Sequence, residues 1–139
     1  MGTFGDLLRQ HVHDMDRLYA VVTSELDSLV EMPLTVVHGD LFPEDVLVDE
    51  DARPLALIDF GYMSTAVDPR FDAAVSGAIY NMYGDHARRL RWTLTNMLAA
   101  ELSYEMHVLV LFQVVYAFAT SNAFTVDGSD GHSPGELSC

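Results

Sequence analysis

The sequence predicts a mixed α+β fold that is mostly helical and contains a short β-hairpin. Apolar residues recur at intervals of three and four over residues 4–31 and 86–102, which is typical of amphipathic helices. Between these ranges, residues 46–48 and 55–58 are short apolar segments on either side of a turn-like sequence, which is typical of a hairpin. The chain has 139 residues, 50% of them hydrophobic, so it is long enough to form one core.

The first half of the chain supplies one long helix and the hairpin. A helix with one apolar face is expected over residues 4–31, because Pro33 follows and ends it. A short strand is expected at 34–37, followed by a loop at 38–45. The hairpin then occupies 46–58, and its turn at 49–54 consists of acidic residues followed by Arg and Pro.

The second half is predicted to be helical. Asp68 and Pro69 have the order of an N-cap and a first helical proline, so a helix is expected from 68 to 83, before Gly84. Two more helices are expected at 86–102 and 105–124. The last one is apolar nearly all round, which indicates burial on several sides or contact with a partner surface. Residues 126–139 are rich in Gly, Ser and Asp and are expected to form a disordered tail after a domain of residues 1–125.

The net charge and the composition indicate which kinds of molecule the protein is expected to bind. The net charge is -14, and the chain contains Arg but no Lys. We expect no nucleic acid partner, because a phosphate backbone requires a clustered cationic face. The acidic field favours a cationic small-molecule substrate, although acidity can also serve solubility alone.

No membrane span or secretory leader is expected. The sequence has no uninterrupted apolar run of about 18 residues, and no basic segment precedes a short apolar one. The single cysteine is Cys139, which excludes an internal disulfide. A cytoplasmic protein is therefore the simplest expectation.

Three aspartates lie close to the predicted hairpin. Asp40 follows the strand at 34–37, Asp45 ends the next loop, and Asp59 ends the hairpin. If the hairpin folds back beside the loop, the three carboxylates meet in one crevice, where a cation would offset their repulsion. Oxygen ligands suit Mg²⁺, and a carboxylate that is not on the metal can accept a proton from a substrate hydroxyl. This chemistry points to metal-assisted phosphoryl transfer.

Three motifs in this region also carry a family resemblance. The segment H-G-D-L-F-P-E-D-V-L-V at residues 38–48 resembles the catalytic loop of aminoglycoside phosphotransferases and choline kinase-like enzymes, which usually reads H-G-D-L-H-P-G-N-[IV]-L. I-D-F-G at 58–61 resembles their metal-binding motif, and D-P-R-F-D at 68–72 resembles the start of their next helix. The three motifs occur in the family's order and at similar intervals.

The resemblance implies a fold and a set of residue roles. It implies the mostly helical C-terminal lobe of a kinase-like fold, with a catalytic loop at 36–48, a metal motif at 57–61 and helices over 68–125. In the catalytic loop, Asp40 would be the base that deprotonates the acceptor hydroxyl, and His38 would brace the loop by hydrogen bonds. Asp59 would be the principal metal ligand and Asp45 the second. Asp72 would be a buried brace for the same loop.

The sequence departs from the family pattern at several points. Position 45 is Asp where the family has Asn, position 42 is Phe where His is common, and position 44 is Glu where Gly is common. No G-x-G-x-x-G segment is present, so the amino-terminal nucleotide lobe of the family is expected to be absent. Arg70 could replace the missing phosphate-binding Lys, or it could brace a loop.

Three functions remain open at this point. The first is ATP- and Mg²⁺-dependent phosphoryl transfer to a small-molecule hydroxyl, with ATP or another nucleoside triphosphate bound with the help of a dimer mate or a partner protein. The second is a non-catalytic, pseudokinase-like module that binds a partner through the face that the absent lobe would cover. The third is an acid/base or metal enzyme that acts on a cationic or other secondary metabolite without nucleotide. A homo-oligomer or a partner protein on that face is expected in the first two cases.

Overall fold

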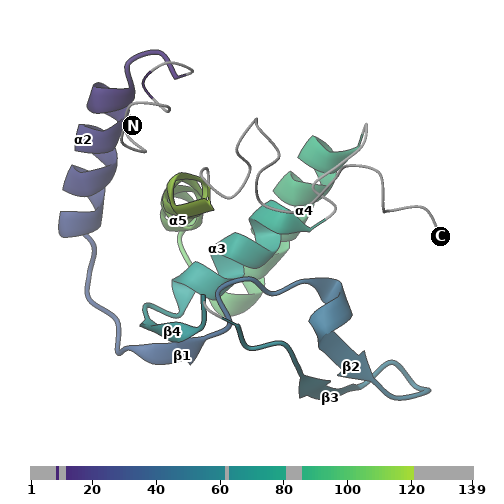
Figure 1. The fold of residues 1–139 in the computed structure, drawn as a ribbon. Helices are drawn as coiled ribbons and strands as arrows, with labels where there is room; N and C mark the ends of the chain where they lie inside the picture. The colour runs from purple at the N-terminus through teal and green to yellow at the C-terminus, as the bar shows by residue number, and fades with distance from the viewer. Residues whose placement is uncertain (1–8, 10–11, 62, 81–85, 121–139) are drawn as a thin grey trace, which may run out of the picture. The chain divides into compact units, whose positions relative to one another are not determined.

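A computed structural model describes residues 9, 12–61, 63–80 and 86–120 of the chain. Figure 1 shows its elements in order: α2 (Met15–Asp27), β1 (Thr35–Val37), a 3₁₀ turn (Pro43–Asp45), β2 (Val46–Val48), β3 (Pro54–Leu57), β4 (Thr65–Val67), α3 (Arg70–Ile79), α4 (Ala87–Leu102) and α5 (Met106–Thr120). The predicted mixed α+β class is confirmed. The chain divides into two compact units, one of Ser28–Gln113 and one that combines Met1–Asp27 with Val114–Cys139.

The described strands form two separate two-stranded sheets within Ser28–Gln113. Strands β2 and β3 make the predicted antiparallel hairpin, in which Val46 pairs with Leu57. Its turn is held by Asp49, whose Oδ1 accepts the N–H groups of Asp51 and Arg53 at 2.9 Å each. Strand β1 pairs antiparallel with β4, so that Thr35 lies opposite Val67 and Val37 opposite Thr65. This second sheet fixes both ends of the segment that carries the acidic residues.

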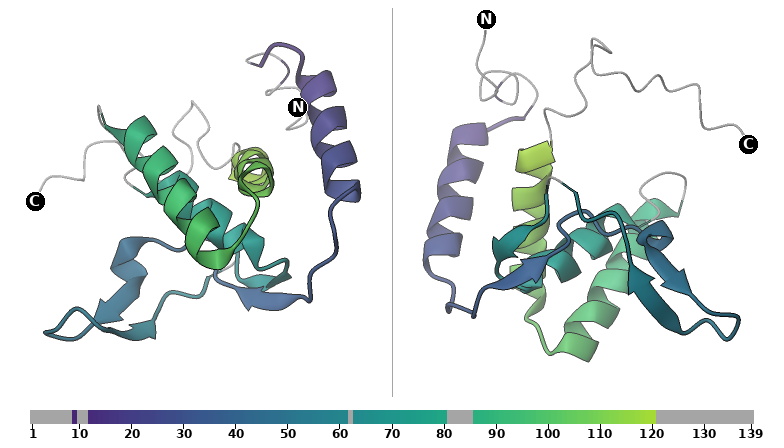
Figure 2. Two further views of the ribbon diagram at one scale, coloured as in Figure 1. Left: turned by 180° about the vertical axis from the view of Figure 1, so that it is seen from behind. Right: turned by 60° about the horizontal axis from the view of Figure 1, so that its bottom comes forward.

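Helices α3 and α4 pack side by side, as both figures show (Figures 1 and 2). Their close approach depends on Gly77, because a Cβ there would lie 2.6 Å from the Thr95 Oγ1 atom. Gln113 of α5 closes the contact, since its Nε2 donates to Thr95 Oγ1 at 3.0 Å and to the Ala74 carbonyl at 3.2 Å. The buried apolar residues of this unit are Val37, Ala73, Ala74, Val75, Ile79, Val108, Leu109 and Phe112.

The start of the helix predicted at 4–31 lies outside the described part of the chain, but the helix is interrupted at 12–14 and ends before residue 31. Helix α2 begins at Met15 because Asp14 adopts a left-handed conformation with φ 57°, which interrupts a helix. It ends at Asp27. Beyond that end, the Val30 carbonyl accepts a hydrogen bond from the Arg70 side chain at 2.9 Å.

The later helices agree with prediction more closely. Helix α4 differs from the predicted range of 86–102 by one residue. Helices α3 and α5 start within two residues of the predicted positions. Helix α3 ends at Ile79 because Tyr80 has a ψ of 118°, so its predicted end at 83 is wrong. The predicted end of α5 at 124 and the predicted tail at 126–139 lie outside the described part of the chain. Among the described residues, none of the helices combines the length and the apolar character that crossing a membrane requires.

Candidate active site

The three predicted aspartates line a single pocket. The pocket has a volume of ≈ 240 Å³, and its walls are formed by His38, Asp40, Phe42, Asp45, Asp59, Gly61 and Met63. All of these residues belong to Ser28–Gln113 and come from two segments, the loop after β1 and the loop after β3. The fold-back of the hairpin beside the loop therefore places the acidic residues around one cavity.

Asp72 of α3 anchors the loop after β1 by accepting two of its backbone N–H groups. Its Oδ2 accepts the backbone N–H of His38, and its Oδ1 accepts the N–H of Gly39, both at 2.8 Å. Gly39 has a φ of 84°, and a Cβ at this position would overlap the Met63 carbonyl. The loop therefore needs glycine at 39 in order to lie against Met63, and this packing fixes the backbone immediately before Asp40.

His38 connects the two loops through Ile58. The imidazole is 3% exposed, and its Nε2 lies 2.8 Å from the Ile58 carbonyl oxygen. Because a carbonyl can only accept, Nε2 carries the proton. The Nδ1 atom has no hydrogen-bond partner among the described residues. The ring also packs against Phe60, with the ring centroids 4.8 Å apart. These contacts place His38 as a support under the pocket.

Asp45 is fixed by its own turn and by Ile58, the residue after β3. Its Oδ2 accepts the Phe42 N–H at 2.8 Å, which closes the 3₁₀ turn and leaves Oδ1 for another ligand. Its carbonyl accepts the Ile58 N–H at 2.9 Å. Ile58 thus bonds to both His38 and Asp45, which sets the position of the next residue, Asp59.

Asp59 itself has an unusual backbone. Its φ is 61°, in the left-handed region that residues other than glycine rarely adopt. Such strain persists only where the surrounding contacts enforce it, and it is concentrated at functional sites. The residue is exposed, and among the described residues nothing hydrogen-bonds to its carboxylate. This carboxylate is therefore accessible to a ligand in the pocket.

The donor set fits a magnesium ion held by two carboxylates. Within the described ranges, no group of three or more His, Cys, Asp or Glu side chains is arranged to hold a metal. The pocket therefore does not present Asp40, Asp45 and Asp59 as a preformed three-ligand group. Mg²⁺ needs only one or two carboxylates, because water and phosphate oxygens complete its shell. Asp45 and Asp59 match that requirement, and their assignment as ligands stays a prediction.

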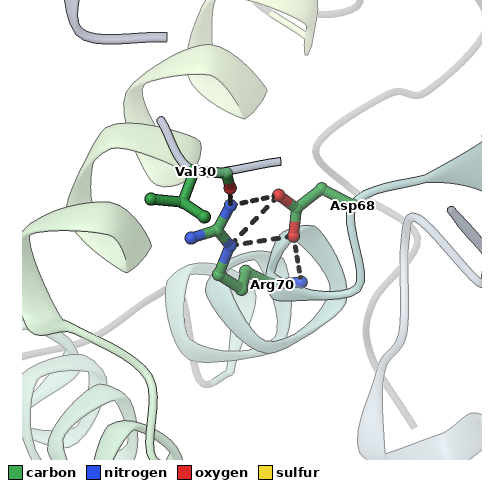
Figure 3. Close-up of polar contacts among 3 residues, drawn as sticks. All are labelled: Val30, Asp68 and Arg70. Atoms are coloured by element: carbon green, nitrogen blue, oxygen red, sulfur yellow. Dashed lines mark hydrogen bonds and ion pairs between the residues drawn. The ribbon is translucent and has the colours of Figure 1, made fainter. Parts of the chain in front are cut away.

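The Arg70 side chain does not line the pocket and instead contacts Asp68 and Val30. Its guanidinium forms a bidentate contact with the Asp68 carboxylate, in which Nε lies 2.9 Å from Oδ1 (Figure 3). Its Nη2 also donates a hydrogen bond to the Val30 carbonyl. The hydrogen bond with the Asp68 side chain raises the pKa of Arg70. Burial alone would raise the pKa of Asp68, but the hydrogen bonds and charge of Arg70 offset burial and hold that pKa below its ordinary value. Arg70 therefore braces the start of α3, as one of its two expected roles required.

The segment of Met63 and Ser64 contacts the loop after β1, and the sequence did not predict it as part of the site. Met63 lines the pocket, and the Ser64 hydroxyl donates to the His38 carbonyl at 2.9 Å. Both residues precede β4, a three-residue strand whose pattern is too short to predict.

One comparison with known proteins returned a match. The model of a family described as "Phosphotransferase enzyme family" (APH) matches residues 5–103. No curated protein and no solved structure matches the chain. The matched range includes both pocket loops and the start of α3.

Proposed function

Because the chain belongs to the phosphotransferase enzyme family, we propose that it transfers a phosphoryl group from a magnesium nucleotide to a hydroxyl group of a small molecule. The observation that carries the proposal is the shared pocket of Asp40, Asp45 and Asp59. Phosphoryl transfer depends mainly on positioning and on neutralising charge. The carboxylates of this pocket would position the substrate hydroxyl and hold the Mg²⁺ ion that neutralises the phosphate charge.

Each aspartate has a distinct role in this proposal. Asp40 accepts the proton of the substrate hydroxyl, because it lies in the pocket directly after the backbone that Asp72 fixes. Asp45 and Asp59 would hold Mg²⁺, with Oδ1 of Asp45 and the accessible carboxylate of Asp59 as ligands. When bound, the ion neutralises the phosphate charge as it develops.

The acidity of the pocket supports a cationic substrate. The side chains of Asp40, Asp45 and Asp59 line the pocket, and the whole chain has a net charge of -14. A hydroxylated amine would be attracted to such a pocket, whereas an anionic metabolite would be repelled. The substrate class is part of the proposal.

The nucleotide phosphates need positive charge that this chain supplies poorly. The sequence has no Lys, and Arg70 is held by Asp68 and Val30. We therefore include a second polypeptide surface, from a partner protein or a second copy, that completes the nucleotide site.

Calorimetric titration with Mg²⁺–ATP tests the proposal. We expect binding heat for the unchanged chain, loss of that heat in Asp59→Asn, and retention of it in Asp40→Asn, which would lose turnover only. Asp27→Asn is a matched control, because it removes the same charge from an exposed position on α2. Equal binding by Asp59→Asn and the unchanged chain would refute the metal role of Asp59.

An enzyme that works without nucleotide is the second candidate. The observation that favours it is the excess of carboxylates over cations around the pocket, which opposes binding of a triphosphate. In that case a cationic metabolite would be turned over without ATP, and Asp40→Asn would abolish the turnover. Turnover that requires ATP would exclude this candidate.

A further inference from the structure

The solvent-facing side of α4 combines two arginines with the only tryptophan of the chain. Arg88, Arg89, Trp92 and Asn96 lie at helical spacing, are all exposed, and are called the α4 outer face below. Trp92 is 59% exposed. Exposure of a single large aromatic residue between cations is unusual for a helix that only packs on a core, because tryptophan and arginine are the residue types most enriched at the centres of protein interfaces.

The charges on this face do not stabilise the helix. The first turn of α4 has no acidic residue and its last turn no basic one, so Arg88 and Arg89 stand at the positive end of the helix dipole. Within the part of the chain that the structure describes, neither arginine pairs with a carboxylate, whereas Arg53 and Arg70 do. Two cations in an unfavourable position, in so acidic a chain, indicate that their partner is intermolecular.

The tip of the hairpin β2–β3 has the complementary chemistry. Asp49, Glu50 and Asp51 form its turn, with Val48 (52% exposed) before them and Leu55 (68% exposed) after them. We call these five residues the hairpin tip. The two strands pair only with each other within the described residues, and β3 is exposed along its whole length. In both figures the hairpin extends away from α3 and α4 (Figures 1 and 2).

The acids of the hairpin tip are available for a partner. Asp49 uses Oδ1 for the turn itself, but Glu50 has no partner among the described residues. Asp51 lies 3.5 Å from Arg53, and both of these side chains are at least 70% exposed, so their contact is weak and exchangeable. Acidic and apolar groups thus stand side by side on a surface that projects into solvent.

We propose that the hairpin tip of one copy of this chain docks on the α4 outer face of a second copy. Arg88 and Arg89 pair with Glu50 and Asp51, while Trp92 covers Val48 and Leu55. The two complementary surfaces occur on the same unit of the chain, Ser28–Gln113, which is why we commit to a second copy as the occupant. Neither surface lines the pocket, so this inference is independent of the proposed phosphotransferase activity.

Repulsion between two acidic chains opposes the contact, so the association is a monomer–dimer equilibrium that depends on concentration. Sedimentation velocity over a concentration series measures it. Trp92 provides a second readout, because it is the only tryptophan and its fluorescence emission shifts to shorter wavelength when the ring is covered. We expect both readouts to change together as the concentration rises.

Charge reversal separates docking from a general effect of net charge. The variant R88E/R89E makes the chain more acidic and E50R/D51R makes it less acidic, yet docking predicts that each variant alone loses association. An equimolar mixture of the two variants should recover it, because each altered surface then meets its complement. W92A should weaken dimerisation without changing the net charge.

The controls reverse charge at exposed positions outside the two surfaces. R17E on α2 and E31R should leave dimerisation as in the unchanged chain. A chain that is monomeric at every concentration, or an E50R/D51R variant that associates more strongly, would overturn the proposal. Binding of the unchanged chain to phosphatidylserine vesicles or duplex DNA, lost in R88E/R89E and without dimerisation, would assign the face to another occupant and overturn it as well.

Discussion

Asp72 follows His38 by 34 positions, yet its Oδ2 accepts the His38 backbone N–H at 2.8 Å. The same carboxylate accepts the Gly39 N–H with its other oxygen. One side chain therefore uses both oxygens to hold two consecutive peptide groups immediately before Asp40. The position of the proposed base depends on a helix that is remote in sequence, so substitutions in α3 should affect the pocket.

The first prediction concerns Asp72→Asn. An amide has only one oxygen, so one of the two N–H groups would face an NH₂ group and lose its partner. Leaving a partly buried donor unsatisfied costs about 1–3 kcal/mol, and urea denaturation should show a loss of that size in the free energy of unfolding. Asp49→Asn is the matched control, because Asp49 holds both of its N–H groups with the single atom Oδ1, which an amide retains. Equal losses in the two variants would contradict the role of the second oxygen.

The second prediction concerns Gly39→Ala. The left-handed conformation with φ 84° costs about 1–2 kcal/mol for a residue with a Cβ, and the overlap with the Met63 carbonyl adds to that cost. We expect a lower thermal midpoint and a displaced pocket loop. Gly61→Ala tests the same substitution at a position where the nearest atom to a Cβ is 3.8 Å away, and it should be tolerated. A stable Gly39→Ala variant would show that the loop can move away from Met63.

The elements that could be predicted are those formed by residues close together in the sequence. The hairpin joins β2 to β3 across one turn, and the periodic pattern of α4 extends over 16 residues, so each is visible within a short window. The pairing of β1 with β4 places Thr35 opposite Val67, and both strands have three residues. Such short strands, far apart in the sequence, have no local pattern from which their pairing could be predicted. The left-handed residue Asp14, which sets the start of α2, is equally invisible to a periodic pattern.

For the pocket, the sequence predicted the aspartates and two of their supports, His38 and Asp72, but not the backbone partners that hold the loops together. Asp40, Asp45 and Asp59 stood out because their motifs are local and resemble a family. The other supports are backbone contacts with remote residues, such as Ile58 with His38 and Ser64 with the His38 carbonyl. Almost every residue type can take part in a hydrogen bond through its backbone, so these contacts cannot be predicted from residue identity.

The third prediction is an energetic coupling between Gly77 and Thr95. Gly77→Ala should destabilise the unit, because the new Cβ would lie 2.6 Å from Thr95 Oγ1 on the facing helix. Thr95→Ala removes that hydroxyl oxygen, which accepts a hydrogen bond from Gln113, so it should be destabilising alone. The double variant should lose less than the sum of the two losses, with a coupling in the range of about 0.5–3 kcal/mol seen for contacting residues. Additive losses in chemical denaturation would mean that the helices separate instead.

The fourth prediction concerns the pH dependence of stability contributed by Asp68 and Arg70. The pKa of Asp68 is lowered from 3.8 in the folded chain. A carboxyl group with a lowered folded pKa stabilises the fold above its unfolded pKa and loses that contribution as the pH falls through the folded value. The free energy of unfolding should therefore differ most between the unchanged chain and Asp68→Asn at neutral pH. The two values should begin to converge only below about pH 4, as the pH falls toward the lowered folded pKa of Asp68.

The size of the difference follows from burial of the pair. The side chains of Arg70 and Asp68 are 10% and 19% exposed, and removing one partner of a buried pair costs about 3 kcal/mol. Asp51→Asn is the control, because Asp51 meets Arg53 at the surface, where such pairs contribute less than about 1 kcal/mol. Denaturation of the three proteins from about pH 7 to about pH 3 measures the effect. If the free energies of unfolding of Asp68→Asn and the unchanged chain change with pH in parallel, Asp68 has the same pKa in the folded and unfolded states. The charge of Asp68 would then contribute nothing to its contact with Arg70.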